Sequence, residues 1–228
     1  MKKIILFFFI INSCSYPKMV SDEIIFFNDF EADNLTNING GLISTYNESK
    51  VLGDFNNDGF TIHLNDIGNH DYIFISFDLY IHGTWDGNKN GFTENDRPDL
   101  WKIEFKPEMS AFGDPDNDYF VTTFSNSPCF SNYCLLQSYP ENYPNTNRPQ
   151  TGHLLKISEK KCQNSFFGGI TTLYKIEKGF KSSGNAISIR FSDELYQPNA
   201  IDKDGVTQQK CDESWSLDNL EIRSINYE

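Results

Sequence analysis

The closing stretch of the chain, residues 212–222, carries acidic groups in a pattern that could hold a cation. Its apolar side chains change from odd to even positions along the stretch: Trp215, Leu217, Leu220 and Ile222. Since the side chains of a strand alternate between its two faces, this change of phase predicts a β-bulge at Asp218 and Asn219, in a strand at the middle of a sheet. We expect the bulge to direct the Asp218 carboxylate toward a cation site shared with Asp29 and Glu31. The alternative is an edge bulge that binds no ligand.

A second candidate cation site is a loop with oxygen-bearing side chains at alternate positions: Asp54, Asn56 and Asp58. The order matches the opening half of an EF-hand or dockerin loop. There, side chains at positions one, three and five bind Ca²⁺, and a glycine at position six, here Gly59, permits the sharp turn. The twelfth position is Asn65 rather than Glu, and no helical pattern flanks the loop. The sequence therefore predicts a calcium turn in a β protein, with a solvated turn as the alternative.

A third loop repeats this spacing with Lys89 inserted, and its candidate Ca²⁺ ligands are Asp86, Asn88 and Asn90. Two carboxylates about 5 Å apart repel by about 3 kcal/mol at an effective dielectric constant of about 20, but by less than about 1 kcal/mol in bulk water. An acidic loop therefore requires a cation only where it is buried. Because this loop follows the longest predicted strand, we expect it to be held rigidly and to bind calcium.

Three further side chains are candidates for contact with a glycan: Trp85, Tyr80 and His82. Trp85 lies in a loop between glycines, beside Asp86, and could form a platform for a sugar ring. Tyr80 and His82 belong to the mixed face of residues 72–82, which either lines an open concave surface or is covered by a loop. In the alternative interpretation all three side chains are structural.

The sequence predicts no catalytic residues. It contains no Gly-x-Ser-x-Gly motif, no His-Glu-x-x-His motif and no phosphate-binding glycine loop. Glu213, Asp218 and Glu221 do not have the spacing of the acid and nucleophile that glucanases of the sandwich class carry on one strand. His82 with Asp78 could form an acid–base pair, with a structural histidine as the alternative.

Strands must position these candidate sites, because apolar residues alternate with polar ones in several segments and no window of twelve residues has a helical period. The predicted strands are residues 24–30, 60–64, 72–82, 101–106, 119–125, 173–180, 187–192 and 212–222. Clusters of Asn, Asp, Gly and Pro, which favour turns, separate them. Many short strands joined by turns predict an all-β sandwich or barrel, and we expect one domain over residues 23–228.

The start of the chain is typical of an export signal. Lys2 and Lys3 precede an apolar run that is too short to span a bilayer but matches a secretory leader. Residues 11–14 then resemble the lipobox of bacterial lipoproteins, which implies lipidation of Cys14. Asn12 departs from that pattern, so ordinary cleavage between residues 13 and 15 is the alternative. We expect residues 1–14 to be the signal peptide and lipobox, and residues 15–22 a short tether, on an outer-membrane or cell-surface lipoprotein or a secreted protein.

Export to an oxidising compartment bears on the other four cysteines, which form an even set. Three pairings are possible, and we favour Cys129–Cys134 and Cys162–Cys211 because a Cys-x4-Cys pair closes a tight loop easily. The chain-entropy model gives about 2 kcal/mol for the short loop and about 4 kcal/mol for the long one. A zinc site would require Cys-x2-Cys pairs or nearby histidines, so we do not expect one.

The charge of the chain excludes some partners. The formal net charge is −13, and the sequence has no basic patch. Both features disfavour nucleic acids and anionic membrane surfaces. We therefore expect membrane attachment only through a lipid anchor at Cys14.

Several ordered motifs resemble a group of uncharacterised secreted proteins with concanavalin A-like or laminin-G-like folds. The motifs are residues 77–88, 98–101, 122–126, 137–140 and 212–220, and they span most of the mature chain. Ser216 stands where that group commonly has glycine. Asp29-Phe30-Glu31 followed by a late Asp-Asn strand also resembles calcium-stabilised jelly-roll modules. The resemblance implies a jelly-roll β-sandwich of two antiparallel sheets with a bound ion, and it implies no reaction.

Together these features predict an exported, calcium-stabilised binding module for a glycan or a cell-surface partner. One alternative is a polysaccharide-active enzyme of the same fold, either a glycoside hydrolase or a lyase. Another is a structural envelope or adhesion protein without a small ligand.

Overall fold

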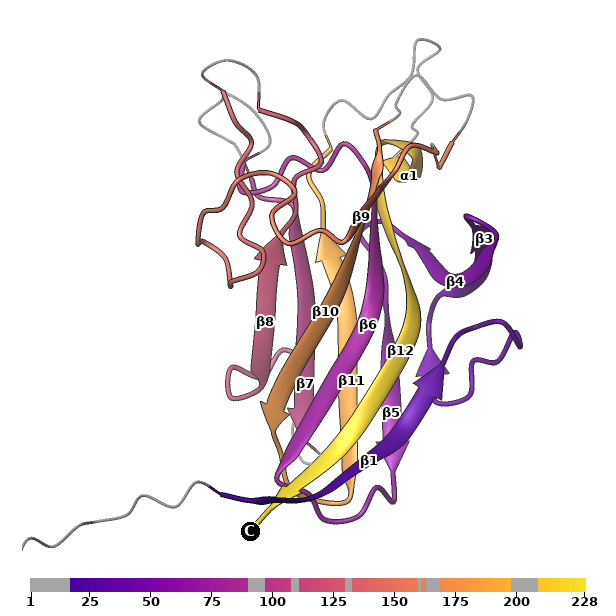
Figure 1. The fold of residues 1–228 in the computed structure, drawn as a ribbon, viewed down its shortest axis with the longest axis vertical. Helices are drawn as coiled ribbons and strands as arrows, with labels where there is room; N and C mark the ends of the chain where they lie inside the picture. Colours follow the sequence, from indigo (N-terminus) through magenta and orange to yellow (C-terminus); the bar gives the residue numbers. More distant parts are fainter. Residues whose placement is uncertain are drawn as a thin grey trace, which may run out of the picture.

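The computed structural model is a sandwich of two antiparallel sheets (Figure 1). It describes residues 17–89, 97–107, 111–129, 133–159, 161–162, 169–197 and 209–228. The seven-stranded sheet contains β1 (Met19–Asn28), β3 (Leu42–Tyr46), β4 (Ser49–Phe55), β6 (Tyr72–Gly83), β9 (Leu155–Ile157), β10 (Thr171–Lys181) and β12 (Glu213–Tyr227). The five-stranded sheet contains β2 (Ile38–Asn39), β5 (Gly59–Asn65), β7 (Leu100–Pro107), β8 (Asp118–Thr123) and β11 (Ala186–Glu194). The prediction of an all-β sandwich with two antiparallel sheets is confirmed.

The strand order places β12 and β6 at the centre of the larger sheet. That order is β3-β4-β12-β6-β10-β9, and β1 pairs with the free part of β12 below β4 (Figure 1). The smaller sheet has the order β2-β5-β11-β7-β8. One short helix, α1 (Gln209–Asp212), precedes β12 at the upper end of the sandwich in Figure 1.

Aromatic side chains from both sheets fill the core between them. The ring of Trp101, from β7, meets Trp215 of β12 edge to face at 5.7 Å and lies 5.7 Å from Phe77 of β6. Phe191 of β11 meets Phe77 edge to face at 5.4 Å. These residues are the apolar members of segments in which apolar and polar residues alternate. The period of two in the sequence therefore predicts which face of each strand is buried.

The predicted bulge in β12 is present. The register of β12 against β6 shifts between Asp218 and Glu221, and Asn219 has a φ of 51°, in the left-handed region that asparagine tolerates. The apolar side chains on either side of the shift are all buried: Trp215, Leu217, Leu220 and Ile222. The bulge therefore keeps both halves of β12 facing the core, as the change of phase predicted.

The beginning of the domain corrects one predicted boundary. Residues 19–22, which we expected to be a tether, belong to β1, where Met19 pairs with Tyr227. This pairing joins segments about 200 residues apart, so no local pattern could show it. Cys14 lies outside the described residues. In the described part of the chain, no helix is long and apolar enough to cross a membrane.

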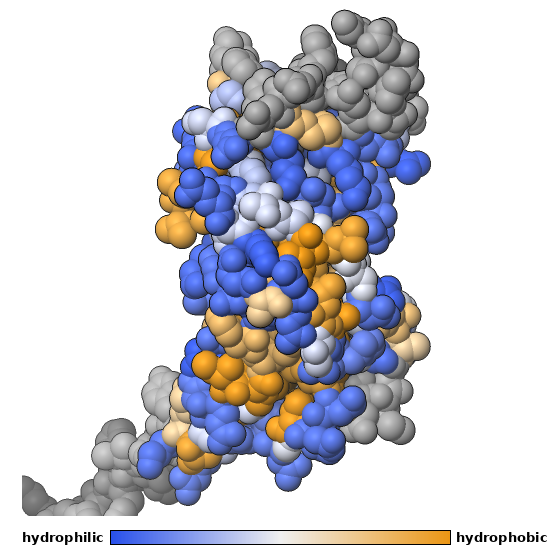
Figure 2. Space-filling model, turned by 90° about the vertical axis from the view of Figure 1, so that its right-hand side faces the viewer, coloured by the Kyte–Doolittle hydropathy of each residue, from blue (hydrophilic) through white to orange (hydrophobic). Residues whose placement is uncertain are grey.

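Both predicted disulfides, Cys129–Cys134 and Cys162–Cys211, are present. Two disulfides indicate an oxidising compartment, which is compatible with export. The lateral face that carries β1, β3 and β4 is apolar in its lower half (Figure 2). Exposed apolar side chains of β1 and β3 include Ile24, Phe27 and Leu42.

Candidate metal centre

Three carboxylates converge where strands of both sheets meet at the upper end of the sandwich. Asp86 follows β6, Asp99 immediately precedes β7, and Glu213 is the first residue of β12. One ligand oxygen from each lies within 4.8 Å of the other two. Since β6 and β12 belong to the larger sheet and β7 to the smaller one, the cluster joins the two sheets.

Backbone hydrogen bonds fix the position of Asp99. Its Oδ2 accepts the amide N–H of Asp86 at 2.9 Å, and its Oδ1 accepts the amide N–H of Tyr196 at 3.2 Å. The Asp99 amide in turn donates to the carbonyl of Gly87 at 3.0 Å. The loop after β6 is thereby attached to the start of β7, and the Asp86 and Asp99 carboxyl groups are held together.

The start of β12 is fixed against the end of β6. Glu213 pairs with Gly83, and the amide of Thr84 donates to the carbonyl of Asp212 at 2.8 Å. Gly83 has a φ of 86°, and a Cβ there would lie 1.8 Å from the Asp212 carbonyl oxygen, so only glycine fits. The Thr84 hydroxyl also donates to Asp212 Oδ1 at 2.7 Å, which places a fourth carboxylate beside the cluster.

Burial and mutual repulsion disfavour the ionised forms of these groups. Asp99 is 0 % exposed and Glu213 is 3 % exposed. Burial, with the Asp212 charge as the second cause, raises the pKa of Asp86 to about 6. Burial, together with Asp86 and Asp212, raises the pKa of Asp99 to about 7 against two opposing backbone hydrogen bonds. The pKa of Glu213 is raised well above its ordinary value by burial, and then by Asp99 and Asp86.

One oxygen of the cluster has no partner. Glu213 Oε2 is buried and forms no hydrogen bond within the described part of the chain. Burying a carboxylate oxygen without a partner is costly, so such an atom suggests a missing ligand. Oxygens bound to one Ca²⁺ at about 2.3–2.6 Å can lie at most about 5 Å apart, a limit that the separation of up to 4.8 Å satisfies. The three carboxylates therefore fit a hard divalent cation.

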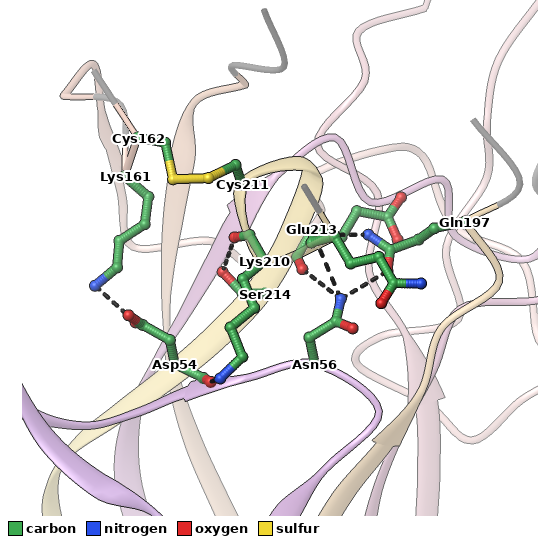
Figure 3. The surroundings of a disulfide bond; sticks show 10 residues. Asp54, Asn56, Lys161, Cys162, Gln197, Lys210, Cys211, Glu213 and Ser214 are labelled. Carbon is green, nitrogen blue, oxygen red and sulfur yellow. Dashed lines mark hydrogen bonds and ion pairs between the residues drawn. A yellow bond between two sulfur atoms is a disulfide. The ribbon is translucent and has the colours of Figure 1, made fainter. Parts of the chain in front are cut away.

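A disulfide supports the segment that carries Asp212 and Glu213 (Figure 3). Cys211 lies in α1 and is bonded to Cys162. Asn56 Nδ2 donates to the Glu213 carbonyl at 2.7 Å and to Gln197 Oε1 at 2.6 Å. Lys210 Nζ donates to the backbone carbonyl of Asp54 at 2.7 Å. These contacts attach α1 to the turn between β4 and β5.

The three residues expected to share a cation through the bulge are only partly brought together. The Ser49 hydroxyl lies 2.9 Å from Glu31 Oε1 and 3.2 Å from Asp218 Oδ2, so it bridges the two carboxylates. Glu31 Oε1 also accepts the Lys50 amide at 2.8 Å. Asp29 instead accepts the Glu31 amide at 3.2 Å in a local turn. In the described residues these three do not form a set of mutually close ligand atoms, so the predicted shared site is wrong.

In the predicted calcium turn after β4, the three candidate side chains bond to different protein partners. The Asp54 carboxylate pairs with the Lys161 ammonium group at 2.7 Å, and Asp58 Oδ1 accepts the Gly59 amide at 2.8 Å. Asn56 Nδ2 donates to the Glu213 carbonyl. The Asp193 carboxylate instead accepts the amides of residues 57 and 58, at 2.6 and 3.0 Å. The turn is therefore held by an internal carboxylate rather than wrapped around an ion.

The loop after β6 contributes one of its three predicted ligands to the cluster. Asp86 is a member, but the Asn88 amide oxygen accepts the hydroxyls of Thr123 and Ser138, and its Nδ2 donates to Asn145 at 2.8 Å. Asn88 thus connects loops, and Asn90 lies outside the described residues. Sequence reasoning missed Asp99 and Glu213 as members of this cluster, although both belong to the ordered motifs singled out in the sequence.

The three residues predicted to contact a glycan are covered. Trp85 is 0 % exposed, and its indole N–H donates to the Ser214 carbonyl at 3.1 Å. His82 is buried, with its ring nitrogens 2.9 Å from Thr171 Oγ1 and 2.7 Å from Ser216 Oγ. Tyr80 is buried beside it, and Tyr46 of β3 packs on both rings. The prediction of a glycan platform at these side chains is therefore wrong. The face of residues 72–82 is covered at Tyr80 and His82, whereas Phe74, Ser76 and Asp78 are half-buried and Tyr72 is exposed.

Comparisons with known proteins add little to this description. No family model matches the sequence, and no curated protein matches it. One similar solved structure is a family GH115 4-O-methyl-α-glucuronidase with specificity for decorated arabinogalactans, at 10 % identity and a TM-score of 0.37. The similarity covers 90 % of this chain and 18 % of that chain, so this chain spans less than a fifth of that protein. A similarity of this size supports no argument about function.

Proposed function

We propose that this protein is an exported β-sandwich binding module stabilised by Ca²⁺ at Asp86, Asp99 and Glu213. The observation that supports the ion most directly is the buried Glu213 Oε2 without a hydrogen-bond partner, beside two further buried or half-buried carboxyl groups. All the candidate ligands are oxygen atoms, which suit a hard cation and not zinc or copper. Its charge would offset the repulsion that raises the pKa values of the cluster.

A binding role fits these carboxylates better than catalysis of glycoside hydrolysis. The two carboxyl groups of a glycosidase flank the scissile bond and must both reach the substrate. Asp99 and Glu213 are almost fully buried, so a polysaccharide chain could not contact both. The position of the cluster, between the ends of β6, β7 and β12, instead suits an ion that holds the two sheets together.

The partner that we propose is a glycan or a cell-surface protein. Two disulfides support a location outside the cytoplasm, where such partners occur. The net charge of −13 disfavours nucleic acid. Lipid attachment at Cys14 remains part of the proposal, and mass analysis of the exported protein would test it.

The test of the ion is the thermal stability of the purified protein in EGTA, in Ca²⁺ and in Mg²⁺. A ligand that binds only the folded state at about 100 times its Kd adds about 2.7 kcal/mol. For a domain of this size, that corresponds to a rise in Tm of about 5–10 °C. We expect this rise in millimolar Ca²⁺ and a smaller one in Mg²⁺, which requires tighter octahedral geometry. An identical Tm in EGTA and Ca²⁺ would refute the proposed metal centre.

A further inference from the structure

A second site lies away from the metal centre, at the open edge between the two sheets. There a cavity of about 610 Å³ is lined by the beginning of β8, the end of β10 and the loop that contains Glu141 and Asn142. The volume lies within the range of about 300–1,000 Å³ typical of small-molecule sites. β9 pairs only with residues 171–173 of β10, so in the described structure the lower part of β10 has no strand on its outer side (Figure 1).

Lys178 is the most informative side chain of this cavity. Its ammonium group lies 3.6 Å from the centre of the Phe120 ring, and its one protein acceptor among the described residues is the Pro140 carbonyl at 3.4 Å. No carboxylate of the described residues lies within 4.0 Å of it. Burial lowers the pKa of Lys178, with Glu141 opposing this effect. An ammonium group has three donors, so after the Pro140 carbonyl and the Phe120 ring at least one donor is available to a ligand.

A lysine that lines another cavity does have a carboxylate partner. Lys161 lines a cavity of about 640 Å³ near Tyr46, but Asp54 neutralises it at 2.7 Å. Glu141, the acid that faces Lys178, already accepts a hydrogen bond from Asn147 Nδ2 at 2.6 Å. The Phe120 ring and the Pro140 carbonyl offset part of the cost of half-burying the Lys178 ammonium group, and a ligand carboxylate would add the ion pair that the described residues do not supply.

The remaining lining of the cavity suits a sugar ring. Tyr119 is 37 % exposed, and its hydroxyl is held by Glu104 at 2.9 Å, so the ring has a fixed position at the rim. Asn142 and Asn145 also line the cavity. Fixed apolar surface with a few converging polar groups is the usual composition of a small-molecule site.

We propose that this cavity binds a uronic-acid unit, with the sugar carboxylate bonded to the Lys178 ammonium group. The inference rests on the proposed role as a binding module and assigns its ligand class, an acidic saccharide. A charge-assisted hydrogen bond between the two groups is stronger than one to a neutral hydroxyl. The negative charge of the whole protein slows the approach of an anion. The cavity itself is lined by two lysines, Lys178 and Lys181, and by two carboxylates, Asp118 and Glu141, so the contact with Lys178 must outweigh the repulsion from these acids.

Calorimetric titration of the full mature chain with D-glucuronate, D-glucose and acetate tests the proposal. We expect saturable binding of glucuronate that is at least about tenfold tighter than binding of either of the other two compounds. Lys178→Met keeps the apolar stem but removes the charge, and it should weaken glucuronate binding by about tenfold or more. Lys156→Met, which removes an exposed charge from β9, is the matched control and should bind like the wild type.

Three results would overturn the inference: no binding of glucuronate, acetate binding as tightly as glucuronate, or an unchanged affinity in a folded Lys178→Met variant. Thermal melts of the same samples with Ca²⁺ and EGTA keep the two proposals distinguishable. A Tm that responds to Ca²⁺ in a protein that does not bind glucuronate would reject the acidic-sugar site while leaving the metal centre in place.

Discussion

Glu213 combines two properties that are rarely found together in one side chain. It is almost fully buried, and one of its oxygens has no hydrogen-bond partner among the described residues. Burial, then Asp99 and Asp86, raise its pKa well above the ordinary value, so its ionised form destabilises the protein when no cation is bound. A residue that serves only the fold would be replaced here by a neutral side chain at little cost. The carboxylate therefore suggests a ligand.

Glu213→Gln tests this interpretation because it keeps the shape and removes the charge. Without Ca²⁺ we expect the variant to be more stable than the wild type by about 1–3 kcal/mol, because repulsion within the cluster falls. The rise in Tm caused by Ca²⁺ should shrink to less than half. Denaturant unfolding in EGTA measures the change in the free energy of unfolding, and thermal melts in EGTA and in Ca²⁺ measure the change in the Tm response.

The control is Glu221→Gln, a partly exposed position on the same strand. It should change neither the stability in EGTA nor the response to Ca²⁺ by more than about 0.5 kcal/mol. If Glu213→Gln destabilised the protein in EGTA and left the Ca²⁺ response intact, Glu213 would be a structural residue and not a ligand.

At the scale of elements, the short helix α1 connects the metal centre to a disulfide. Cys211 is followed directly by Asp212 and Glu213, and its partner Cys162 is 49 residues away in sequence. Lys161, next to Cys162, pairs with Asp54 at 2.7 Å, and Lys210 donates to the same residue's carbonyl (Figure 3). The disulfide thus limits the movement of α1 relative to the end of β4.

Loss of the Cys162–Cys211 bond should weaken both the fold and Ca²⁺ binding. In the chain-entropy model a loop of this length contributes about 4 kcal/mol, and the loop of Cys129–Cys134 about 2 kcal/mol. We expect Cys162→Ser/Cys211→Ser to lower the free energy of unfolding by the larger amount and to weaken Ca²⁺ binding by about tenfold. Cys129→Ser/Cys134→Ser should leave Ca²⁺ affinity unchanged. Equal Ca²⁺ affinity of both double variants by calorimetry would show that the bond does not position the carboxylates.

The sequence predicted those elements whose information is local. Alternation in β7 and β11 and the change of phase at Asp218 lie within one strand, so strands, buried faces and bulge could all be inferred. Burial of Trp85 depends instead on its contact with Ser214, 129 residues away. The exposure of an aromatic side chain in a loop cannot be inferred from its neighbours in sequence.

The metal centre required information that a single sequence does not contain locally. Its three carboxylates come from the end of β6 and from the beginnings of β7 and β12, which converge only after both sheets have formed. Spacing within one loop selected Asp86, which lies in the carboxylate cluster, but it also selected Asn88 and the 54–59 turn, whose oxygens have protein partners. Regular spacing of oxygen-bearing side chains is a useful sign of a calcium loop only when those side chains are not already bonded to other parts of the protein.

At the scale of the whole molecule, the buried carboxylates give the stability a particular dependence on pH. Raised pKa values mean that the folded state binds protons more tightly than the unfolded state, so stability falls as the pH rises through the folded pKa. The pKa of Asp99, at about 7, and the pKa of Glu213, well above its ordinary value, both act in this direction. Glu31 and Glu104, whose pKa values are lowered, lose their contribution only below about pH 4.5.

Buried His82 has the opposite effect below its unfolded pKa of about 6.5, since burial lowers the pKa of the imidazole and the folded state resists protonation. Between pH 6.5 and 8 the remaining titration of this histidine in the unfolded chain raises the stability by only about 0.4 kcal/mol, less than the loss expected from the acidic cluster. In EGTA we therefore expect the Tm to fall by about 2–4 °C from pH 6.5 to pH 8. In millimolar Ca²⁺ the fall in Tm should disappear, because metal binding releases protons and strengthens as the pH rises.

The Glu213→Gln variant in EGTA should show a flatter dependence of Tm on pH than the wild type. A wild-type Tm in EGTA that rose over this pH range would contradict the assignment of raised pKa values to the cluster.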